Sequence, residues 1–211
     1  MKKTGIRALI LDYGGVISKP QNLEHFQEFL QILGIDEERF LEVYYTQRKN
    51  YDNGQLSGQE YWLGILQHFG FEPNGSMVED LIRTDVKSWT EINRPMMGFI
   101  EESRAKVEKL AIISNMMRDT LSYMKSHFEW LDIFDEQIYS CEIGINKPDT
   151  RIFELCLNRL DISPRECLFV DDSHKNVLGA VKSGMNVIHY KSFPQFSQEF
   201  SKQYYLIGEQ G

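Results

Sequence analysis

The feature that most constrains the fold is a short apolar run near the N-terminus that ends in an acidic residue. Residues 8–11 read Ala-Leu-Ile-Leu, and Asp12 follows them, shortly before Gly14 and Gly15. Consecutive apolar residues are typical of a buried parallel strand, and the glycines are typical of a tight loop. In an open α/β sheet, ligands bind at the carboxyl ends of the strands. Asp12 is therefore expected in the crevice of such a sheet, although an Asp before a Gly is also common in a plain turn.

Two more apolar runs of this kind end in polar residues. They are residues 110–113, followed by Ser114 and Asn115, and residues 167–170, followed by Asp171 and Asp172. Residues with helical apolar spacing lie between these runs and in the C-terminal tail, at Phe193, Phe196, Phe200, Tyr204 and Tyr205. A weaker strand pattern covers residues 138–140, and a further strand is expected at residues 186–190. Strands that alternate with helices predict a parallel sheet covered by helices on both faces, which is a three-layer, Rossmann-like α/β fold.

The segment from about residue 20 to residue 90 interrupts this alternation, because its apolar residues recur only at helical spacing. One of its helices is expected from Asp36, as N-cap, to about Asn50, and Ser57 and Glu60 form a capping box at the start of another. We therefore predict an α/β core domain from residues 1–17 and 95–211, with a helical cap domain inserted at residues 18–94. An insertion after the first strand would lie over the crevice and could act as a lid.

Composition excludes several classes of function. The net charge of the 211 residues is −8, which argues against nucleic acid as a partner. The cysteines number three and lie in apolar runs, which favours reduced thiols in a cytoplasmic protein over a disulfide framework. No apolar stretch reaches the length of a signal-peptide core or a membrane span, so no membrane partner is expected. The sequence does not distinguish a monomer from a homodimer.

The polar residues at the strand ends, together with Lys147 in a loop before a helical pattern, form an ordered set. Asp12, Ser114, Lys147 and the pair Asp171-Asp172 resemble, in this order, the four motifs of the haloacid dehalogenase superfamily of hydrolases. The resemblance covers essentially the whole chain, because the helical insertion lies where that superfamily has its C1-type cap. Taken singly, Ser114 fits a strand-end cap and Lys147 fits a solvated loop residue; the order and spacing of all four motifs favour the resemblance.

The resemblance implies a Mg²⁺-dependent phosphatase that acts on a small phosphorylated metabolite, such as a sugar phosphate. It implies that Asp12 is the nucleophile and forms an aspartyl-phosphate. It also implies that Ser114, Asn115 and Lys147 bind the phosphoryl group, with Ser114 and Lys147 sharing in catalysis. The ligands that it implies for Mg²⁺ are Asp12, the backbone carbonyl of Gly14, Asp172 and, close by or in the second shell, Asp171.

Gly14 departs from the pattern of these phosphatases, which usually carry a second aspartate two residues after the nucleophile as the general acid and base. Without this aspartate, the chain lacks general acid–base catalysis at this position, which typically contributes ~10²–10⁴-fold in rate. Two alternatives follow. The dehalogenase branch of the superfamily also lacks this aspartate, but it works without metal and has small polar residues where this chain has Asp171-Asp172. The other alternative is a weak or inactive member that binds a phosphorylated ligand or a protein partner.

The paired carboxylates of Asp171 and Asp172 favour the phosphatase interpretation, because adjacent carboxylates repel each other unless a cation or donor lies nearby. The selectivity for substrate would reside in the cap. Cap residues that fit either a substrate contact or a structural role are Tyr44, Arg48, Lys49, Tyr51 and Trp62.

Overall fold

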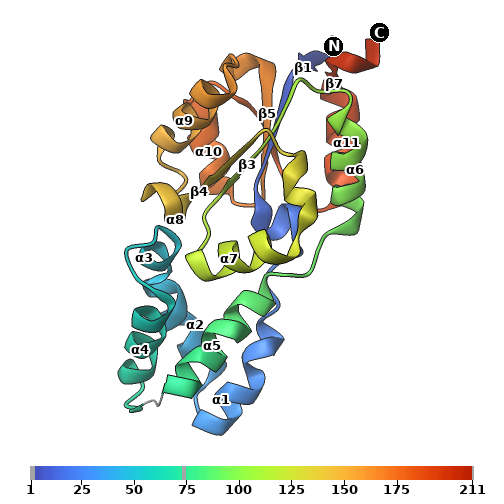
Figure 1. Cartoon of the computed structure of the whole chain (residues 1–211). Helices are drawn as coiled ribbons and strands as arrows, with labels where there is room; N and C mark the ends of the chain where they lie inside the picture. The colour runs from blue at the N-terminus through green and yellow to red at the C-terminus, as the bar shows by residue number, and fades with distance from the viewer. Residues whose placement is uncertain (1–2, 73–74, 211) are drawn as a thin grey trace.

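A computed structural model describes residues 3–72 and 75–210, and its centre is a parallel five-stranded sheet (Figure 1). The strands are ordered β4-β3-β2-β5-β6, so the strand before Asp12 is the central one. Leu9 of β2 pairs with Leu110 of β3 on one side and with Leu168 of β5 on the other. The strands are β2 (Ala8–Leu11), β3 (Lys109–Ser114), β4 (Glu136–Tyr139), β5 (Cys167–Asp171) and β6 (Asn186–His189).

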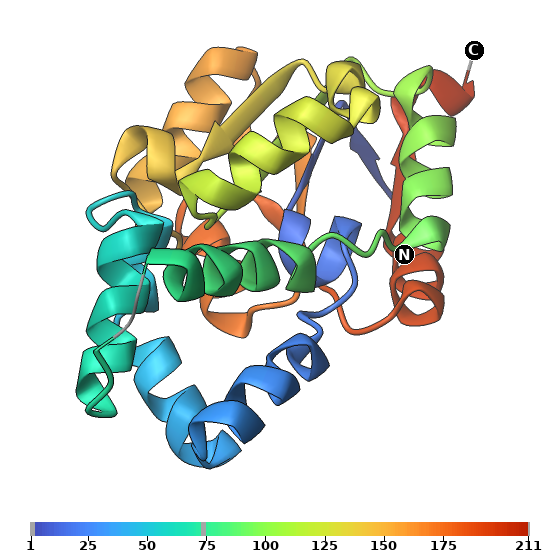
Figure 2. The same cartoon turned by 60° about the horizontal axis from the view of Figure 1, so that its bottom comes forward.

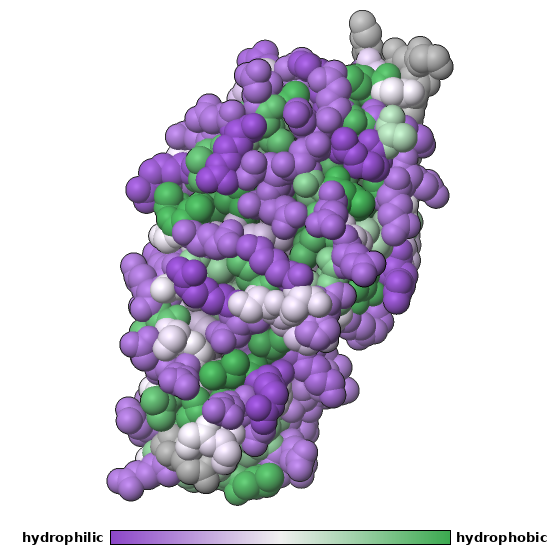
Figure 3. Space-filling model, viewed as in Figure 1, coloured by the Kyte–Doolittle hydropathy of each residue, from purple (hydrophilic) through white to green (hydrophobic). Residues whose placement is uncertain are grey.

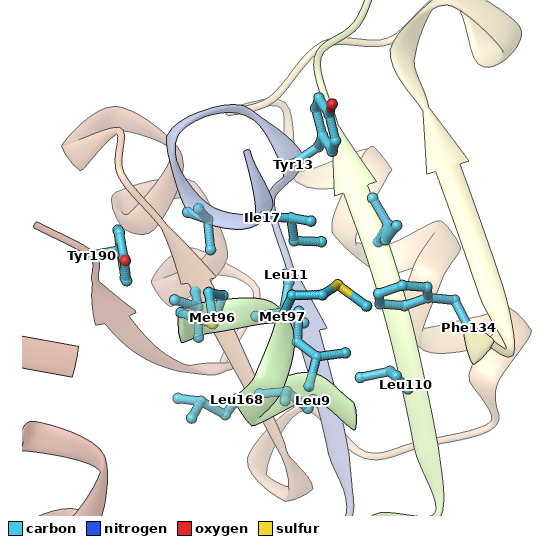
Figure 4. Close-up of a cluster of buried hydrophobic side chains, with 14 of the residues drawn as sticks. Leu9, Leu11, Tyr13, Ile17, Met96, Met97, Leu110, Phe134, Leu168 and Tyr190 are labelled. Carbon is cyan, nitrogen blue, oxygen red and sulfur yellow. The ribbon is translucent and has the colours of Figure 1, made fainter. Parts of the chain in front are cut away.

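Helices cover both faces of this sheet, as the alternation of patterns predicts. The side chains of Leu9 and Leu11 pack with the first helical layer, in the buried cluster drawn in Figure 4. Ala8 and Ile10 point to the opposite face and pack with the second layer. The first layer holds α6 (Arg94–Arg104), α7 (Arg118–His127) and α11 (Phe193–Gln203). The second holds α9 (Thr150–Leu160) and α10 (His174–Lys182). The three-layer α/β prediction is confirmed.

Residues 23–88 form helices that pack beside the carboxyl ends of the strands (Figures 1 and 2). We call them the inserted helices. They have an aromatic core of their own, in which the ring centroids of Phe26 and Trp62 lie 5.5 Å apart. The predicted capping box of Ser57 and Glu60 is present at the start of α4. The inserted helices are η2 (Leu23–Phe26), α1 (Gln27–Leu33), α2 (Glu37–Thr46), α3 (Arg48–Asp52), α4 (Gly58–His68) and α5 (Gly75–Ser88).

Two antiparallel segments connect the inserted helices to the rest of the chain. Ser18 pairs with Ile92 across these segments, and the Asn93 amide donates to the Ile17 carbonyl at 2.9 Å. Both passages of the chain therefore run side by side. The division into domains at residues 17–18 and 94–95 stays a prediction.

Two parts of the chain differ from the sequence expectation. The helical pattern that begins after Asp36 is broken at Gln47, whose φ of −102° and ψ of 0° separate α2 from α3. The C-terminal residues after α11 form a strand, β7 (Tyr204–Leu206), which pairs in parallel with β1 (Thr4–Ile6). This small sheet depends on contact between the two ends of the chain, which local patterns do not encode.

The remaining elements are short helical turns: η1 (Tyr13–Ile17), η3 (Glu129–Ile133), α8 (Ser140–Ile143), η4 (Pro164–Glu166) and η5 (Ile207–Gln210). All three cysteines are buried and free. In the described residues, no helix combines the length and apolarity that crossing a membrane requires. Hydrophilic residues predominate on the face shown in Figure 3, and hydrophobic ones are scattered among them.

Candidate active site

The polar residues predicted at the strand ends come together at the edge of the sheet that faces the inserted helices. Asp12 directly follows the central strand β2, and Ser114 and Asp171 are the last residues of the two strands that flank it. Carboxylate oxygens of Asp12, Asp171 and Asp172 all lie within 4.8 Å of one another. The parallel register of the sheet thus converts three distant stretches of sequence into one cluster.

Lys147 enters this cluster from the loop before α9 and is completely buried at its side chain. Its Nζ lies 2.9 Å from Oδ1 of Asp12 and 2.6 Å from Oδ2 of Asp171, and it also donates to the Ile113 carbonyl at 2.8 Å. Burial disfavours the ammonium ion, but the adjacent carboxylates outweigh this cost and raise the pKa of Lys147. Lys147 is therefore a fixed positive charge beside Asp12.

Asn115 and Asp171 hold Lys147 in place. The Asn115 side chain accepts from the Lys147 backbone amide at 2.8 Å and donates to its carbonyl at 3.0 Å. Both oxygens of Asp171 are occupied, because Oδ2 binds Lys147, Oδ1 accepts from the Ser173 amide at 2.7 Å, and the Asn176 amide donates to each at 3.1 Å. These contacts give both side chains a positioning role; a substrate contact for Asn115 and a place close to the metal or in its second shell for Asp171, which the resemblance implies, stay predictions.

Asp12 is nearly buried, with 7% of its surface exposed. Its Oδ1 receives the Tyr13 amide at 2.7 Å as well as Lys147, and no described residue donates to its Oδ2. Burial raises the pKa of Asp12 to about 8, with a further upward contribution from the charges of Asp171 and Asp172 and an opposing one from Lys147. Burial, followed by the charge of Asp171, likewise raises the pKa of Asp172.

The residues of this cluster fit a divalent cation. Three carboxylates face a single ammonium group, so full ionisation leaves two negative charges without a partner. Carboxylate oxygens are hard ligands of the kind that Mg²⁺ prefers. Since Asp171 is already occupied by Lys147 and Asn176, Asp12 and Asp172 are the carboxylates available to such an ion.

The two glycines after Asp12 differ in what they require. Gly15 has a φ of +72°, a backbone conformation that favours glycine, and a Cβ there would lie only 2.4 Å from Oδ2 of Asp172. Any larger residue at position 15 would therefore be strained and would clash with this carboxylate. Gly14 has an ordinary φ of −64°. A Cβ at Gly14 would lie 3.1 Å from Cζ3 of Trp89. The indole of Trp89, and not the backbone conformation, therefore restricts a side chain at residue 14.

A cavity of about 390 Å³ opens onto the cluster, between the sheet edge and the inserted helices. Asp12, Gly14, Ser114 and Asp172 line its core side. The Ser114 hydroxyl is buried, and its one contact among the described residues is a long one of 3.5 Å, to the Asn115 carbonyl. A volume of this size suits a small ligand.

The sequence missed most residues on the other side of this cavity. Its lining there includes Tyr45, Asp52, Trp89, Met116, Met117 and Thr120. Of the cap residues considered from the sequence, Arg48 lines this cavity and Lys49 lines a neighbouring hollow. Tyr44, Tyr51 and Trp62 are buried in the core of the inserted helices. No local pattern marks the lining residues. Tyr45, Asp52 and Trp89 reach the cavity only through the packing of α2, α3 and α5, while Met116, Met117 and Thr120 lie between β3 and α7 or in α7 itself.

Comparison with known proteins identifies the family of this arrangement. A family model described as haloacid dehalogenase-like hydrolase matches residues 6–184. A sesquiterpene phosphatase of Aspergillus oryzae is 26% identical over 192 residues, which cover 88% of this chain and 90% of the fungal protein. A glyceraldehyde 3-phosphate phosphatase of Methanothermobacter thermautotrophicus is 39% identical over 56 residues, which cover 26% of this chain and 25% of that protein.

Other curated relatives are much longer than the match. Mouse acyl-CoA dehydrogenase family member 10 is 37% identical over 97 residues, or 44% of this chain, and the match spans 9% of the mouse protein. Mouse bifunctional epoxide hydrolase 2 is 24% identical over 87% of this chain, and the match spans 36% of the mouse protein.

Solved structures show the same fold. A HAD family enzyme from Bacteroides thetaiotaomicron superposes with a TM-score of 0.78 at 22% identity, covering 93% of this chain and 99% of that one. A mutant of the same enzyme in complex with magnesium and inorganic phosphate superposes with a TM-score of 0.76 at 21% identity, covering 93% of this chain and 100% of that one. An L-2-haloacid dehalogenase from Xanthobacter autotrophicus superposes with a TM-score of 0.65 at 20% identity, covering 93% of this chain and 83% of that one.

Proposed function

The chain belongs to the haloacid dehalogenase-like hydrolases, and on this premise we propose that it is a Mg²⁺-dependent phosphatase that acts on a small phosphorylated metabolite through an aspartyl-phosphate on Asp12. The observation that carries the proposal is the Lys147–Asp12 contact of 2.9 Å inside a carboxylate cluster that opens onto the cavity. Relatives that are named phosphatases support the choice of reaction. The magnesium and phosphate complex of the Bacteroides enzyme supports the choice of metal.

Asp12, Asp172 and the backbone carbonyl of Gly14 would hold Mg²⁺, which supplies positive charge toward the transferred phosphoryl group when it is bound. In the first step, a carboxylate oxygen of Asp12 attacks phosphorus. The bond from phosphorus to the leaving oxygen breaks, and that oxygen keeps the electron pair and takes a proton from water. In the second step, water attacks phosphorus, the bond to Asp12 breaks, and inorganic phosphate leaves with the Asp12 carboxylate restored.

The other residues of the site serve charge and position in these steps. Lys147 favours ionised Asp12 and offsets the negative charge of the phosphoryl oxygens. Ser114, whose hydroxyl makes one long contact within the described part of the chain, would donate to a phosphoryl oxygen. The inserted helices act as the cap that closes the cavity over a small substrate.

The test is phosphate release from a panel of small phosphate esters, sugar phosphates and acetyl phosphate, with Mg²⁺ and with EDTA. We expect release that requires Mg²⁺ and that falls by at least ~10³-fold in Asp12→Asn, because the nucleophile is lost. Asp132→Asn, which changes an acidic residue outside the carboxylate cluster and outside the cavity lining, is the matched control and should retain activity.

Gly14 favours a second candidate, a weak or inactive member that binds a phosphorylated ligand. Silence across the panel, together with Mg²⁺ binding that depends on Asp12, would favour this binding role. Metal-independent halide release from a 2-haloacid would instead favour the dehalogenase branch, which the pair Asp171-Asp172 argues against.

A further inference from the structure

The cavity has a wall of aromatic rings and thioethers beyond the carboxylate cluster. This wall consists of Tyr13, Tyr45, Trp89, Met116 and Met117. Tyr45, which lines the cavity, is 50% exposed, and its ring lies edge-on to Tyr44 with the centroids 5.0 Å apart. Flat apolar groups bind well against such rings, whereas a polyhydroxylated group would lose its hydration there.

Arg48 is the one cation among the described residues that line this cavity, and its charge is already matched. Its Nε donates to Asp52 at 2.9 Å, and one terminal nitrogen contacts Asp85 at 3.1 Å. The other terminal nitrogen contacts the Met117 sulfur at 2.8 Å. With these partners, the guanidinium has little capacity for a second anionic group on a substrate.

The other polar groups on this side are also largely occupied. Asn115 holds the backbone of Lys147, and Asp52 accepts from Arg48. The Thr120 hydroxyl and the Trp89 indole nitrogen are buried and have no hydrogen-bond partner among the described residues, so each can still donate one hydrogen bond. These contacts suit an uncharged leaving group with few polar atoms.

The wall also determines how the leaving oxygen departs. The Trp89 ring lies where a side chain at Gly14 would project, and Gly14 itself offers no proton. Without a general acid, the rate depends strongly on how stable the leaving anion is by itself. A phenolate is far more stable than the alkoxide of a sugar, so the missing acid and the aromatic wall favour the same kind of substrate.

We propose that the substrate is a phosphate monoester of an uncharged, mostly apolar phenol, whose ring lies between Tyr45 and Trp89 in the 390 Å³ cavity. This inference rests on the proposed phosphatase function. A charged leaving group would instead need the neighbouring hollow, which carries Lys49 and Arg151 but is not lined by Asp12 or Asp172.

The test compares kcat/KM for 1-naphthyl phosphate, glucose 6-phosphate, fructose 1,6-bisphosphate and acetyl phosphate. We expect 1-naphthyl phosphate to exceed both sugar phosphates by at least ~10²-fold, the lower range of what a general acid contributes. Acetyl phosphate has a good leaving group but no ring, so it reports on the chemistry alone.

Tyr45→Ala separates recognition from chemistry. It should raise KM for 1-naphthyl phosphate about tenfold, as expected for a lost aromatic contact, while kcat/KM for acetyl phosphate stays within about threefold. Tyr123→Ala is the matched control, because Tyr123 is also a partly exposed tyrosine but does not line the cavity. Lys49→Ala should leave both substrates unchanged.

Each outcome decides the inference. A preference for a sugar phosphate, a loss of its hydrolysis in Lys49→Ala, or an equal effect of Tyr45→Ala on naphthyl and acetyl phosphate would overturn the phenol assignment while the phosphatase function stands. Failure to hydrolyse any substrate, acetyl phosphate included, would overturn the phosphatase function itself.

Discussion

Trp89 occupies the space that a side chain at residue 14 would need, so the two residues have to be considered together. The backbone at residue 14 accepts any side chain, but a Cβ there meets the indole at 3.1 Å. We expect Gly14→Asp alone to give little gain in kcat on an alkyl phosphate, because the ring has to move. Gly14→Asp combined with Trp89→Leu should raise kcat about tenfold or more relative to Trp89→Leu, because a proton donor then has room.

The measurement is a double-mutant cycle in kcat on an alkyl phosphate and on acetyl phosphate. Coupling confined to the alkyl phosphate supports proton donation by the new carboxyl group. Additive effects on both substrates would mean that the indole does not exclude an acid from this position.

Lys147 stabilises the fold as well as the proposed reaction. Asp171 is fully buried, and Lys147 is its ion-pair partner. Lys147→Met leaves that carboxylate without its counter-charge, so we expect the free energy of unfolding to fall by about 3–5 kcal/mol and turnover to disappear. The double variant Lys147→Met/Asp171→Asn should recover much of the stability in urea unfolding, but no turnover. Recovery of both would mean that Lys147 only neutralises Asp171.

At the residue level, the residues on one side of the cavity can be predicted from the sequence, and those on the other side cannot. Asp12 and Ser114 stand out because each follows an apolar run, and the ends of parallel strands meet at one edge. Tyr45 and Trp89 carry no such mark, since they reach the cavity only when the inserted helices pack beside α7 (Figure 2). The use of Asp171 to hold Lys147 also depends on contacts across 24 residues of sequence.

Among the elements, α4 owes its first turn to a local device that is readable from sequence. Ser57 accepts the Glu60 amide at 3.2 Å, and Glu60 accepts the Ser57 amide at 2.8 Å. We expect Ser57→Ala to lower the free energy of unfolding by about 1 kcal/mol, the usual cost of losing an N-cap. Ser126→Ala, at an exposed position in the last turn of α7, should change it by less than ~0.5 kcal/mol. Equal losses in urea unfolding would contradict a capping role.

Local signals of this kind locate helices better than they locate breaks. The cap at Asp36 is present, but the break at Gln47 follows no turn residue. Arg48, the first residue of α3, is buried against Asp52 and Asp85. Tertiary ion pairs thus accompany the break, and helix propensity alone would have continued through it. The pairing of β1 with β7 is non-local in the same way.

For the whole molecule, the unbalanced charge at the sheet edge links metal, pH and stability. In the metal-free protein, burial raises the pKa of Asp12 to about 8 from an ordinary value of 3.8. Between these values the folded state binds a proton that the unfolded state lacks, so the free energy of unfolding falls as pH rises, by up to about 1.4 kcal/mol per pH unit.

Mg²⁺ should offset this loss of stability at higher pH, because it binds the ionised carboxylates, and it does so only in the folded state. We therefore expect Mg²⁺ to raise the melting temperature above its value in EDTA by more at about pH 8 than at about pH 5, where protons compete for Asp12. Asp12→Asn removes both the titrating group and a ligand, so its melting temperature should respond weakly to Mg²⁺ at either pH. A Mg²⁺ response in the native chain that is equal at both pH values would show that the cation binds away from Asp12.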